Sequence, residues 1–324
     1  MAVTLMDYFR QSKDPIHKAF IADLLRASQL LEQVPFVPLP GLQVSATRWL
    51  TMPSVAFRTI GAGYTEGTGK TEQIEETLYA LGGDVKIDRL LKGGNTFEDP
   101  LVTQMKMKAK AMAFKFNDQF INGDLTVDVN GFEGLKKRVS NMPTRQTIDL
   151  AQSTDSLKVL ASTANTHLFL DGLAKAEKYV AGATHFLMNE NTILQFESAL
   201  RRTSPALLTT VKDSWDREIT AYKGIPMIDV GLLSDKSTEI ITNTEDPGDA
   251  GNDATSLYAV RIDTDDGLCG LQKEGSTPEP YDPLGGAELE SGPQYLRRID
   301  WAVGLLNISN YCIARVKGFR METS

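Results

Sequence analysis

The sequence predicts an α+β protein with extended segments that project from the folded part. Three observations lead to this fold class. One long helix is clearly bounded over residues 100–122, short strand-like runs alternate with shorter helices after it, and two segments before it are too rich in proline or glycine to pack a core. With 324 residues, of which 41% are hydrophobic, the chain can bury a sizeable core.

Charge and cysteine content exclude several classes of protein. The formal net charge is -8 and no dense basic block occurs, so sequence-specific nucleic-acid binding is not expected. Cys269 and Cys312 alone do not make a disulfide framework, which favours folding in a reducing cytoplasm. The N-terminal residues lack the pattern of a secretory signal, and no window approaches the roughly 18 consecutive apolar residues of a membrane span. We therefore expect a protein made in the cytosol without membrane contact.

The first 47 residues have the features of an arm. A helix is predicted over residues 15–33, because Asp14 followed by proline is a typical helix start, and Ile16, Phe20 and Leu24 then fall on one face. The following VPFVPLPG contains three prolines, which force an extended path. We expect either an arm that binds a neighbouring subunit or an ordinary helix docked on its own chain.

Residues 48–92 are glycine-rich and predict a two-stranded excursion. Val55–Ile60 is a predicted strand, and Glu72–Leu81 is a second strand or a short helix. The sequence GAGYTEGTGKT between them is too polar to pack a core. Isolated two-stranded hairpins are marginally stable in water, so we expect this one to lean on a neighbouring molecule.

The clearest helix is bounded by Asp99 and Pro100 at its start and by Gly123, a predicted left-handed stop. It would be roughly 34 Å long at 1.5 Å per residue. Two apolar stripes predict burial against two layers. The first comprises Phe97, Leu101, Met105, Met112, Phe116 and Phe120, and the second comprises Met107, Phe114 and Ile121.

The rest of the chain alternates helices and strands. Helices are predicted at Thr166–Ala181 and after Asn189 or Asn191, where either asparagine can cap the first turn. The predicted strands are Thr184–Met188, Pro226–Val230, a hairpin of Leu257–Ile262 with Leu268–Leu271, and two closing strands at Tyr295–Val303 and Tyr311–Val316.

Catalytic signatures are not found. The segment Gly63–Thr71 approximates a phosphate-binding loop, but five residues instead of four separate Gly63 from Gly69, so a flexible loop tip is preferred over a nucleotide-dependent enzyme. The three histidines lack metal-ligand spacing, and no nucleophile elbow occurs. We therefore predict no catalytic, cofactor-binding or metal-binding residue, and no enzyme.

The order of these elements resembles the Johnson, or Hong Kong 97-like, fold of the major capsid proteins of tailed bacteriophages. The resemblance covers roughly residues 48–318. The stretches that carry it are FNDQFINGD followed by NGFEGL, LFLDGLAKAEKYV, HFLMNENTILQFESALR, AYKGIPMIDV, SLYAVRIDTDDGLCGLQ and YLRRIDWAVGLLNISNYCIARV. These are packing and turn patterns, and their weight comes from their order along the chain.

The resemblance implies a division of the chain and a function. The implied parts are an N-terminal arm (1–47), an extended E-loop hairpin (48–96), a peripheral domain with the spine helix (97–144), an axial domain (145–235), and a return with closing peripheral strands (236–324). The implied function is the structural subunit of an icosahedral capsid, assembling into hexamers and pentamers around packaged DNA. The expected intersubunit contacts are Ile16, Phe20, Leu24, Arg58, Lys70 and Glu72.

The resemblance also implies partners and a location. No helical scaffold segment of about a hundred residues precedes the arm, so a separate scaffolding protein is expected, together with a portal, a decoration protein and non-specific contact with DNA. The protein would be assembled in the host cytoplasm and reside in the virion capsid. Some family members form a covalent crosslink, but no glutamate follows Asn307 and Asn310 closely enough to expect one here. An encapsulin, a bacterial nanocompartment shell, is the alternative with the same fold.

Overall fold

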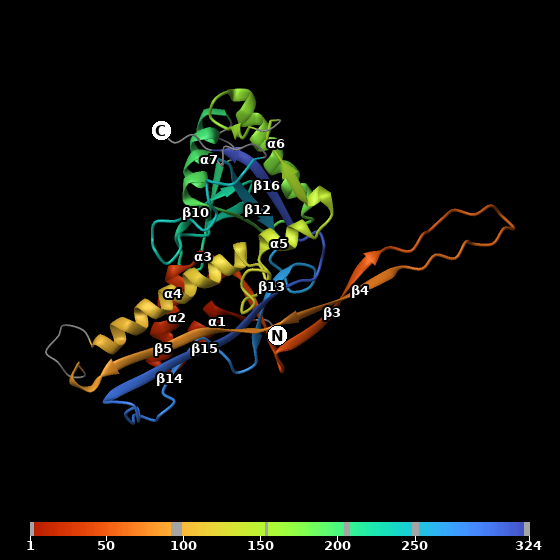
Figure 1. Ribbon diagram of the computed structural model, residues 1–324. Coiled ribbons are helices and arrows are strands. Elements are labelled where there is room, and N and C mark those ends of the chain that lie inside the picture. The colour runs from red at the N-terminus through yellow and green to blue at the C-terminus, as the bar shows by residue number, and fades with distance from the viewer. Residues whose placement is uncertain (1–2, 92–98, 153–154, 204–207, 248–252, 321–324) are drawn as a thin grey trace.

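The computed structural model describes residues 3–91, 99–152, 155–203, 208–247 and 253–320. Figure 1 shows a lower body built around a long helix and a six-stranded sheet, an upper body built on an eight-stranded sheet, and a hairpin that projects to one side. Helices and strands are mixed along the chain, so the predicted α+β class is confirmed.

The lower body combines the start of the chain with strands from its end. Its sheet has the order β1-β2-β13-β15-β14, and β5 also pairs with β15. The strands are β1 Val3–Thr4, β2 Pro35–Leu39, β5 Tyr79–Asp88, β13 Leu268–Lys273, β14 Pro280–Tyr281 and β15 Gln294–Asn307. The helices are α1 Leu5–Gln11, α2 Pro15–Ala27, α3 Gln29–Gln33 and α4 Pro100–Asn122, with the short 3-10 helix η1 Arg89–Leu91.

The upper body has the strand order β6-β16-β12-β8-β11-β10-β9, with β7 also paired to β16. These strands are β6 Thr147–Asp149, β7 Leu157–Lys158, β8 His185–Met188, β9 Leu208–Lys212, β10 Glu218–Tyr222, β11 Ile225–Asp229, β12 Thr255–Val260 and β16 Ile313–Arg320. The helices are α6 Thr163–Tyr179 and α7 Glu190–Thr203, while α5 Leu135–Ser140 and η2 Thr144–Gln146 lead in from the lower body.

The upper sheet is buried on both faces, which explains its apolar strands. In β12, Leu257 and Ala259 join the core under α6 and α7, whereas Tyr258 and Val260 point into the core of the lower body. This alternation is the two-residue period of a strand. The lower core continues through Phe116 of α4, so the two bodies share one packed interior.

The spine helix α4 forms as the sequence predicts. Asp99 caps it by accepting a hydrogen bond from the Leu101 N–H at 2.9 Å. The first apolar stripe is buried at Met112, Phe116 and Phe120, but Met107 of the second stripe is 60% exposed. Phe97, assigned to the first stripe, lies outside the described residues.

Gly123 ends the helix for a different reason from the one predicted. Its φ is −51°, which is not left-handed. A Cβ at this position would collide with the carbonyl oxygens of Gln119 and Phe132, so glycine is required by close backbone approach.

The N-terminal segment is not an extended arm. Its predicted helix is broken at Ser28, whose hydroxyl donates to Asn117 Oδ1 at 2.7 Å and accepts from the Leu31 N–H at 3.1 Å. Phe20 and Leu24 are 3% and 0% exposed and pack in the core of their own subunit. This corrects the expectation that they contact a neighbour, because the hydrophobic face of α2 is already covered by α4. Of the three apolar residues only Ile16 is exposed.

Consecutive strands near the end of the chain lie in different sheets, although a hairpin was predicted for the first two of them. β12 and β13 lie in different sheets, and so do β15 and β16. Instead β12 pairs with β16 in the upper sheet, and β13 pairs with β15 in the lower sheet. The predicted hairpin at 257–271 is therefore corrected, whereas both predicted closing strands are present as β15 and β16. Each segment was long enough for a strand, but the sequence held no signal for its partner.

The projecting hairpin is shifted from the predicted range. Its strands are β3 Gln43–Thr51 and β4 Lys70–Thr77, whereas β5 belongs to the lower sheet. The predicted strand Val55–Ile60 has no partner among the described residues and forms part of the irregular tip.

We predict that Leu24→Ala lowers the free energy of unfolding by about 2–5 kcal/mol, because it leaves a cavity between α2 and α4. The matched control is Ile16→Ala on the same helix, whose side chain is 59% exposed and whose removal should change stability by less than about 0.5 kcal/mol. Urea unfolding followed by circular dichroism measures both. Equal effects of the two substitutions would contradict the burial of α2 in its own subunit.

Candidate assembly surfaces

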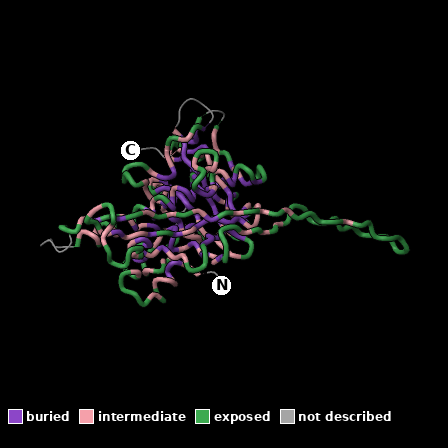
Figure 2. The backbone as a smooth tube through the Cα atoms, turned by 60° about the horizontal axis from the view of Figure 1, so that its bottom comes forward, coloured by how far each residue is buried: buried purple, intermediate pink, exposed green. Residues whose placement is uncertain are grey.

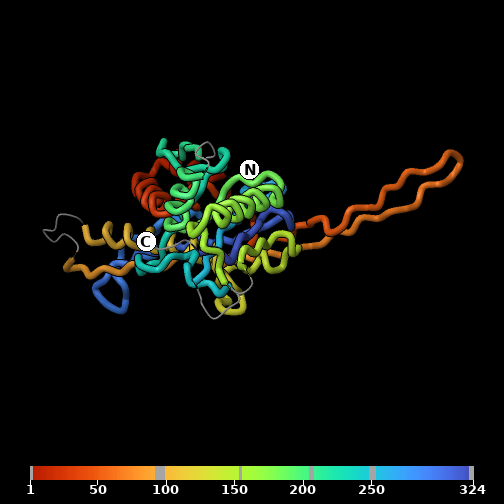
Figure 3. Tube along the Cα trace, turned by 90° about the horizontal axis from the view of Figure 1, so that it is seen from above, coloured from red at the N-terminus to blue at the C-terminus, as the bar shows by residue number. Residues whose placement is uncertain are grey.

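The tip of the hairpin carries apolar side chains that the rest of the chain leaves uncovered. Residues 52–69 join β3 to β4 far from both bodies (Figures 1 and 3). Val55, Phe57 and Ile60 are 94%, 109% and 105% exposed, and Figure 2 shows the hairpin as largely exposed along its length. Contiguous exposed apolar surface of this kind marks a contact with another molecule.

Three predicted contact residues lie on this hairpin in different environments. The Arg58 guanidinium donates to the Ala62 carbonyl at 3.0 Å and lies over the Tyr64 ring, 4.9 Å from its centre. Lys70 begins β4 and is exposed. Glu72 is bound within the hairpin by Arg48 at 2.7 Å, across the β3–β4 pair. Arg58 and Lys70 are both exposed, although Arg58 contacts its own tip, whereas Glu72 forms an ion pair across the two strands.

The glycine-rich segment Gly63–Thr71 does not have the geometry of a phosphate-binding loop. Such a loop places backbone N–H groups around phosphates at the start of a helix. Here the segment runs into β4, a strand, and the hairpin tip lies away from the rest of the chain (Figure 3). This arrangement does not support the alternative of a nucleotide-dependent enzyme.

The base of the hairpin is held by Arg138, whose side chain is 5% exposed. Its guanidinium binds both carboxylate oxygens of Glu76 in β4, at 2.5 and 3.0 Å. It also donates to the Leu305 carbonyl at 3.0 Å and to Asn307 in β15, while Nε donates to the Glu133 carbonyl at 2.8 Å. One side chain of α5 thus joins the hairpin to the lower sheet.

Apolar packing supports the same base. Leu78, between β4 and β5, is 5% exposed and packs in a small core cluster with Leu39, Cys269, Leu271 and Leu306.

The sequence analysis did not identify Arg138 as a residue of this site. The available signal was its spacing, since Leu135, Arg138 and Val139 fall on one helix face and an arginine between two apolar positions indicates burial with a partner.

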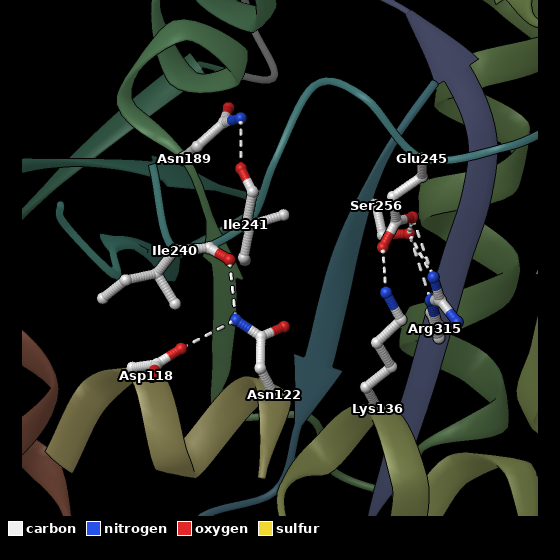
Figure 4. Close-up of polar contacts among 9 residues, drawn as sticks. All are labelled: Asp118, Asn122, Lys136, Asn189, Ile240, Ile241, Glu245, Ser256 and Arg315. Atoms are coloured by element: carbon white, nitrogen blue, oxygen red, sulfur yellow. Dashed lines mark hydrogen bonds and ion pairs between the residues drawn. The ribbon is translucent and has the colours of Figure 1, made fainter. Parts of the chain in front are cut away.

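A second polar cluster lies where the two bodies meet (Figure 4). Asn122, at the end of α4, donates to the Ile240 carbonyl at 2.9 Å, and Asn189 donates to the Ile241 carbonyl at 3.0 Å. Asn189 also caps α7 by accepting from the Thr192 N–H at 2.8 Å, which confirms one of the two predicted caps. The connecting segment between β11 and β12 is therefore fixed to both bodies.

Glu245 completes this junction. Its carboxylate binds Lys136 of α5 at 3.0 Å and Arg315 of β16 at 2.8 Å, and it accepts from the Ser256 hydroxyl (Figure 4). Burial acts to raise the pKa of Glu245, but the charge of Arg315, the Ser256 hydroxyl and Lys136 outweigh it and hold the pKa below its ordinary value.

Metal-binding side chains do not cluster in the described part of the chain. It contains no group of three or more His, Cys, Asp and Glu side chains that could hold a metal ion. His185 is partly buried, and this burial lowers its pKa to about 4, so it is neutral at pH 7. Its Nδ1 forms a hydrogen bond with the adjacent Thr184 hydroxyl. None of the helices in the described residues is long and apolar enough to span a membrane.

Neither protein-family models nor curated proteins match the sequence, but solved structures match the fold. The SrpI encapsulin of Synechococcus elongatus PCC 7942 has 13% identity and a TM-score of 0.61, covering 91% of this chain and 90% of that one. A structure from Microbacterium phage Oxtober96 has 13% identity and a TM-score of 0.57, covering 89% of this chain and 90% of that one. The capsid of a native GTA particle has 16% identity and a TM-score of 0.55, covering 91% and 90%.

These likenesses extend over almost the whole chain and show that it has the Hong Kong 97-like fold. The projecting hairpin has its base at residues 43 and 77, within or close to the range 48–96 for which the resemblance predicts an E-loop. The assignment of an axial and a peripheral domain stays a prediction, and each of the two described bodies contains strands from the end of the chain.

We predict that Arg138→Met destabilises the subunit by about 3–5 kcal/mol, because it leaves Glu76 without its cation in a partly buried place. The double variant with Glu76→Gln should recover part of this loss. Arg48→Met is the control, since the Arg48–Glu72 pair lies farther out on the hairpin, where such a pair contributes about 0–1 kcal/mol. Urea denaturation of the three variants tests the ranking, and equal losses for Arg138→Met and Arg48→Met would refute it.

The Glu245 junction predicts a pH dependence of known sign. Because the folded-state pKa is depressed, the contribution of Glu245 is present above its unfolded pKa of about 4.5 and is lost as the pH falls through the folded pKa. Glu245→Gln should therefore cost about 1.5–3 kcal/mol at pH 7, and the difference from the parent protein should shrink toward pH 3. Exposed Glu218→Gln is the control. A Glu245→Gln difference that stays constant between pH 7 and pH 3 would argue against a depressed pKa.

Proposed function

We propose that this protein is the structural subunit of an icosahedral phage capsid that assembles into hexamers and pentamers around packaged DNA. The observation that carries the proposal is the projecting hairpin, whose tip exposes Val55, Phe57 and Ile60 almost completely. A hairpin of two strands is marginally stable alone, and full burial of each such side chain is worth about 1.5–3 kcal/mol. Contact with another molecule would supply that burial.

The fold supports a shell as the molecule that the hairpin meets. The similar structures include the capsid of a GTA particle and a structure from a Microbacterium phage, and both match this chain over about nine-tenths of its length. A projecting element that binds a different surface on the next copy gives a heterologous contact, which closes into a ring when the rotation between copies fits. Hexamers and pentamers are such rings.

The glycines in the tip suit a shell that contains both kinds of ring. Hexamer and pentamer positions differ in curvature, so the hairpin must bend differently in each. Gly61 has a φ of 91° at the turn, a conformation that glycine adopts without strain, and a Cβ at Gly61 or Gly63 would meet nothing. These positions therefore leave the tip deformable.

The proposal includes the partners expected for such a capsid. A separate scaffolding protein would guide assembly in the host cytoplasm, a portal would occupy one vertex, and a decoration protein would bind the outside of the virion. Contact with DNA would be non-specific and local, because the chain as a whole carries a net charge of -8. In this proposal the protein is not an enzyme and needs no cofactor.

An encapsulin-type nanocompartment is the second candidate, favoured by the likeness to the SrpI encapsulin at a TM-score of 0.61. The two candidates differ in what the particle contains. Particles isolated from the native source should hold genome-length DNA if the protein is a capsid subunit. Nuclease-resistant DNA is measured directly in the purified particles, and a protein cargo without DNA would support the encapsulin instead.

We predict that replacing residues 53–68 by Asn-Gly abolishes particles but leaves the subunit folded. The tip contributes no residue to the described core clusters, and Asn-Gly is a favoured two-residue turn between antiparallel strands. Circular dichroism melting compares subunit stability, and sedimentation with negative-stain microscopy measures assembly. Particles formed at the parental yield would count against a role of the hairpin in the shell.

A further inference from the structure

The turn between β9 and β10 reaches from the upper body onto the N-terminal helices. The Ser214 N–H donates to the Glu32 carboxylate of α3 at 2.8 Å. Beside it, the Trp215 ring packs on Phe9 of α1, with 5.6 Å between the two ring centres. Two segments that lie far apart in the sequence therefore form one surface.

Cations lie over both aromatic rings of this contact. The Lys18 ammonium lies 5.0 Å from the centre of the Phe9 ring, and the Arg26 guanidinium lies 5.6 Å from the centre of the Trp215 ring. Both cations come from α2, and a cation over the face of a ring is attracted by the ring's quadrupole. The two packed rings therefore hold both positive charges on the same surface.

Two further cations lie next to these in the chain. Arg10 follows Phe9 in α1, and Lys13 lies in the short connection from α1 to α2. All four cationic residues are exposed, and none of them lies within ion-pair distance of a carboxylate in the described residues. We call Arg10, Lys13, Lys18 and Arg26 the cationic patch.

The carboxylates of the same segments do not cancel this charge. Asp7 caps α1 from its first turn, and the side chains of Glu32 and Asp213 are each 1% exposed. Asp14 and Asp23 line an open groove between α2, α4 and β14, whose lining includes none of the four patch residues. In a chain with a net charge of -8, the patch is thus a local excess of exposed positive charge.

The chemistry of the patch fits the phosphates of duplex DNA. A duplex carries one negative charge about every 1.7 Å along its axis, so a small group of cations meets several phosphates without reading the sequence. The Phe9 and Trp215 rings are half-buried and have cations over their faces, so they offer no platform on which unpaired bases could stack. The surface therefore favours a duplex over a single strand.

The patch stays open while the projecting hairpin extends elsewhere. In Figure 3 the N-terminal helices, in red, lie together on one side of the molecule, and the hairpin extends away from them. A contact made by the hairpin with another molecule would therefore leave the patch of its own subunit uncovered.

We propose that the cationic patch is the surface through which each subunit contacts duplex DNA, by its phosphates and without reading the base sequence. This inference rests on the proposed function, because it assigns to named residues the DNA contact that a capsid subunit makes. It also gives the contact of the β9–β10 turn with the N-terminal helices a role, since Phe9 and Trp215 hold two of the four cations.

DNA binding by the full-length subunit before assembly tests the patch. Fluorescence anisotropy with a short labelled duplex measures the affinity at several salt concentrations. If four phosphates are neutralised, the affinity of the parent protein should fall about 100-fold between 50 and 200 mM salt. The test variant combines Arg10→Gln, Lys13→Gln, Lys18→Gln and Arg26→Gln. It should lose most of this salt dependence and bind at least about tenfold more weakly at 50 mM salt.

The matched control removes the same charge from exposed positions of the upper body. It combines Lys158→Gln, Lys175→Gln, Lys178→Gln and Arg202→Gln. This control should bind more tightly than the test variant. An equal loss in both variants would overturn the inference, because net charge alone would then explain the binding. Unchanged binding in the test variant, or tighter binding of a single strand than of a duplex by the parent, would overturn it as well.

Two smaller changes keep the test informative if the test variant does not fold, which circular dichroism melting measures. Arg10→Gln and Lys13→Gln remove cations that contact no aromatic ring, and each should reduce the slope of log affinity against log salt by about 0.9. The double variant Arg10→Lys with Arg26→Lys keeps every charge and should bind like the parent. Loss of binding in this double variant, or an unchanged slope in both single variants, would overturn a contact made through charge.

Shell formation separates this inference from the proposed function. The test variant should still assemble into particles, which sedimentation measures. Particles from a parent protein whose DNA binding does not depend on the patch would overturn the inference and leave the proposed function intact. Patch-dependent DNA binding without particles under any assembly conditions would overturn the proposed function and leave the contact intact. Binding of an acidic scaffolding protein by the patch, without binding of DNA, would overturn the inference and assign the surface to that protein.

Discussion

A guanidinium buried at the base of the hairpin is the constraint on which the rest of the structure depends. Arg138 must have partners on every side, because an unpaired buried cation is costly, and its partners come from β4, from β15 and from the loop before α5. Satisfying this one side chain therefore fixes the direction in which the hairpin leaves the body. The apolar packing of Leu78 beside it removes the remaining freedom.

The junction between the two bodies combines apolar burial with polar specificity. Alternate residues of β12 enter two cores, so the upper sheet is a middle layer between its own helices and the lower body. Apolar contacts alone would tolerate sliding of one body over the other. The hydrogen bonds of Asn122 and Asn189 to consecutive carbonyls, and the ion pairs of Glu245, select one relative position.

The sequence could predict the parts of the fold that depend on local signals. The cap of the spine helix is Asp99 and the cap of α7 is Asn189, as expected, because these caps involve only neighbouring residues. The helix also ends at Gly123, but through close approach to Phe132 and not through a left-handed conformation. Strand partners could not be predicted, since the pairings of β12 with β16 and of β13 with β15 depend on residues far apart in the chain.

The prediction that the N-terminal helix contacts a neighbouring subunit was wrong for Phe20 and Leu24. An amphipathic helix has the same sequence pattern whether its apolar face covers the core of its own subunit or a surface of another subunit. For the candidate site, the exposed tip could be predicted from its glycines, whereas the role of Arg138 depends on partners that are distant in the sequence.

The continuity of the hairpin with the lower sheet has a mechanical consequence. β4 passes through Leu78 directly into β5, and β5 is paired with β15 from Tyr79–Val303 to Asp88–Gln294. In Figure 1 the hairpin and this ladder run along nearly the same line. Tension applied at the tip therefore loads the ladder in shear, so that many hydrogen bonds resist together, whereas a perpendicular pull would open them one at a time. A shell that carries internal pressure through such elements would resist rupture along the hairpin axis most strongly.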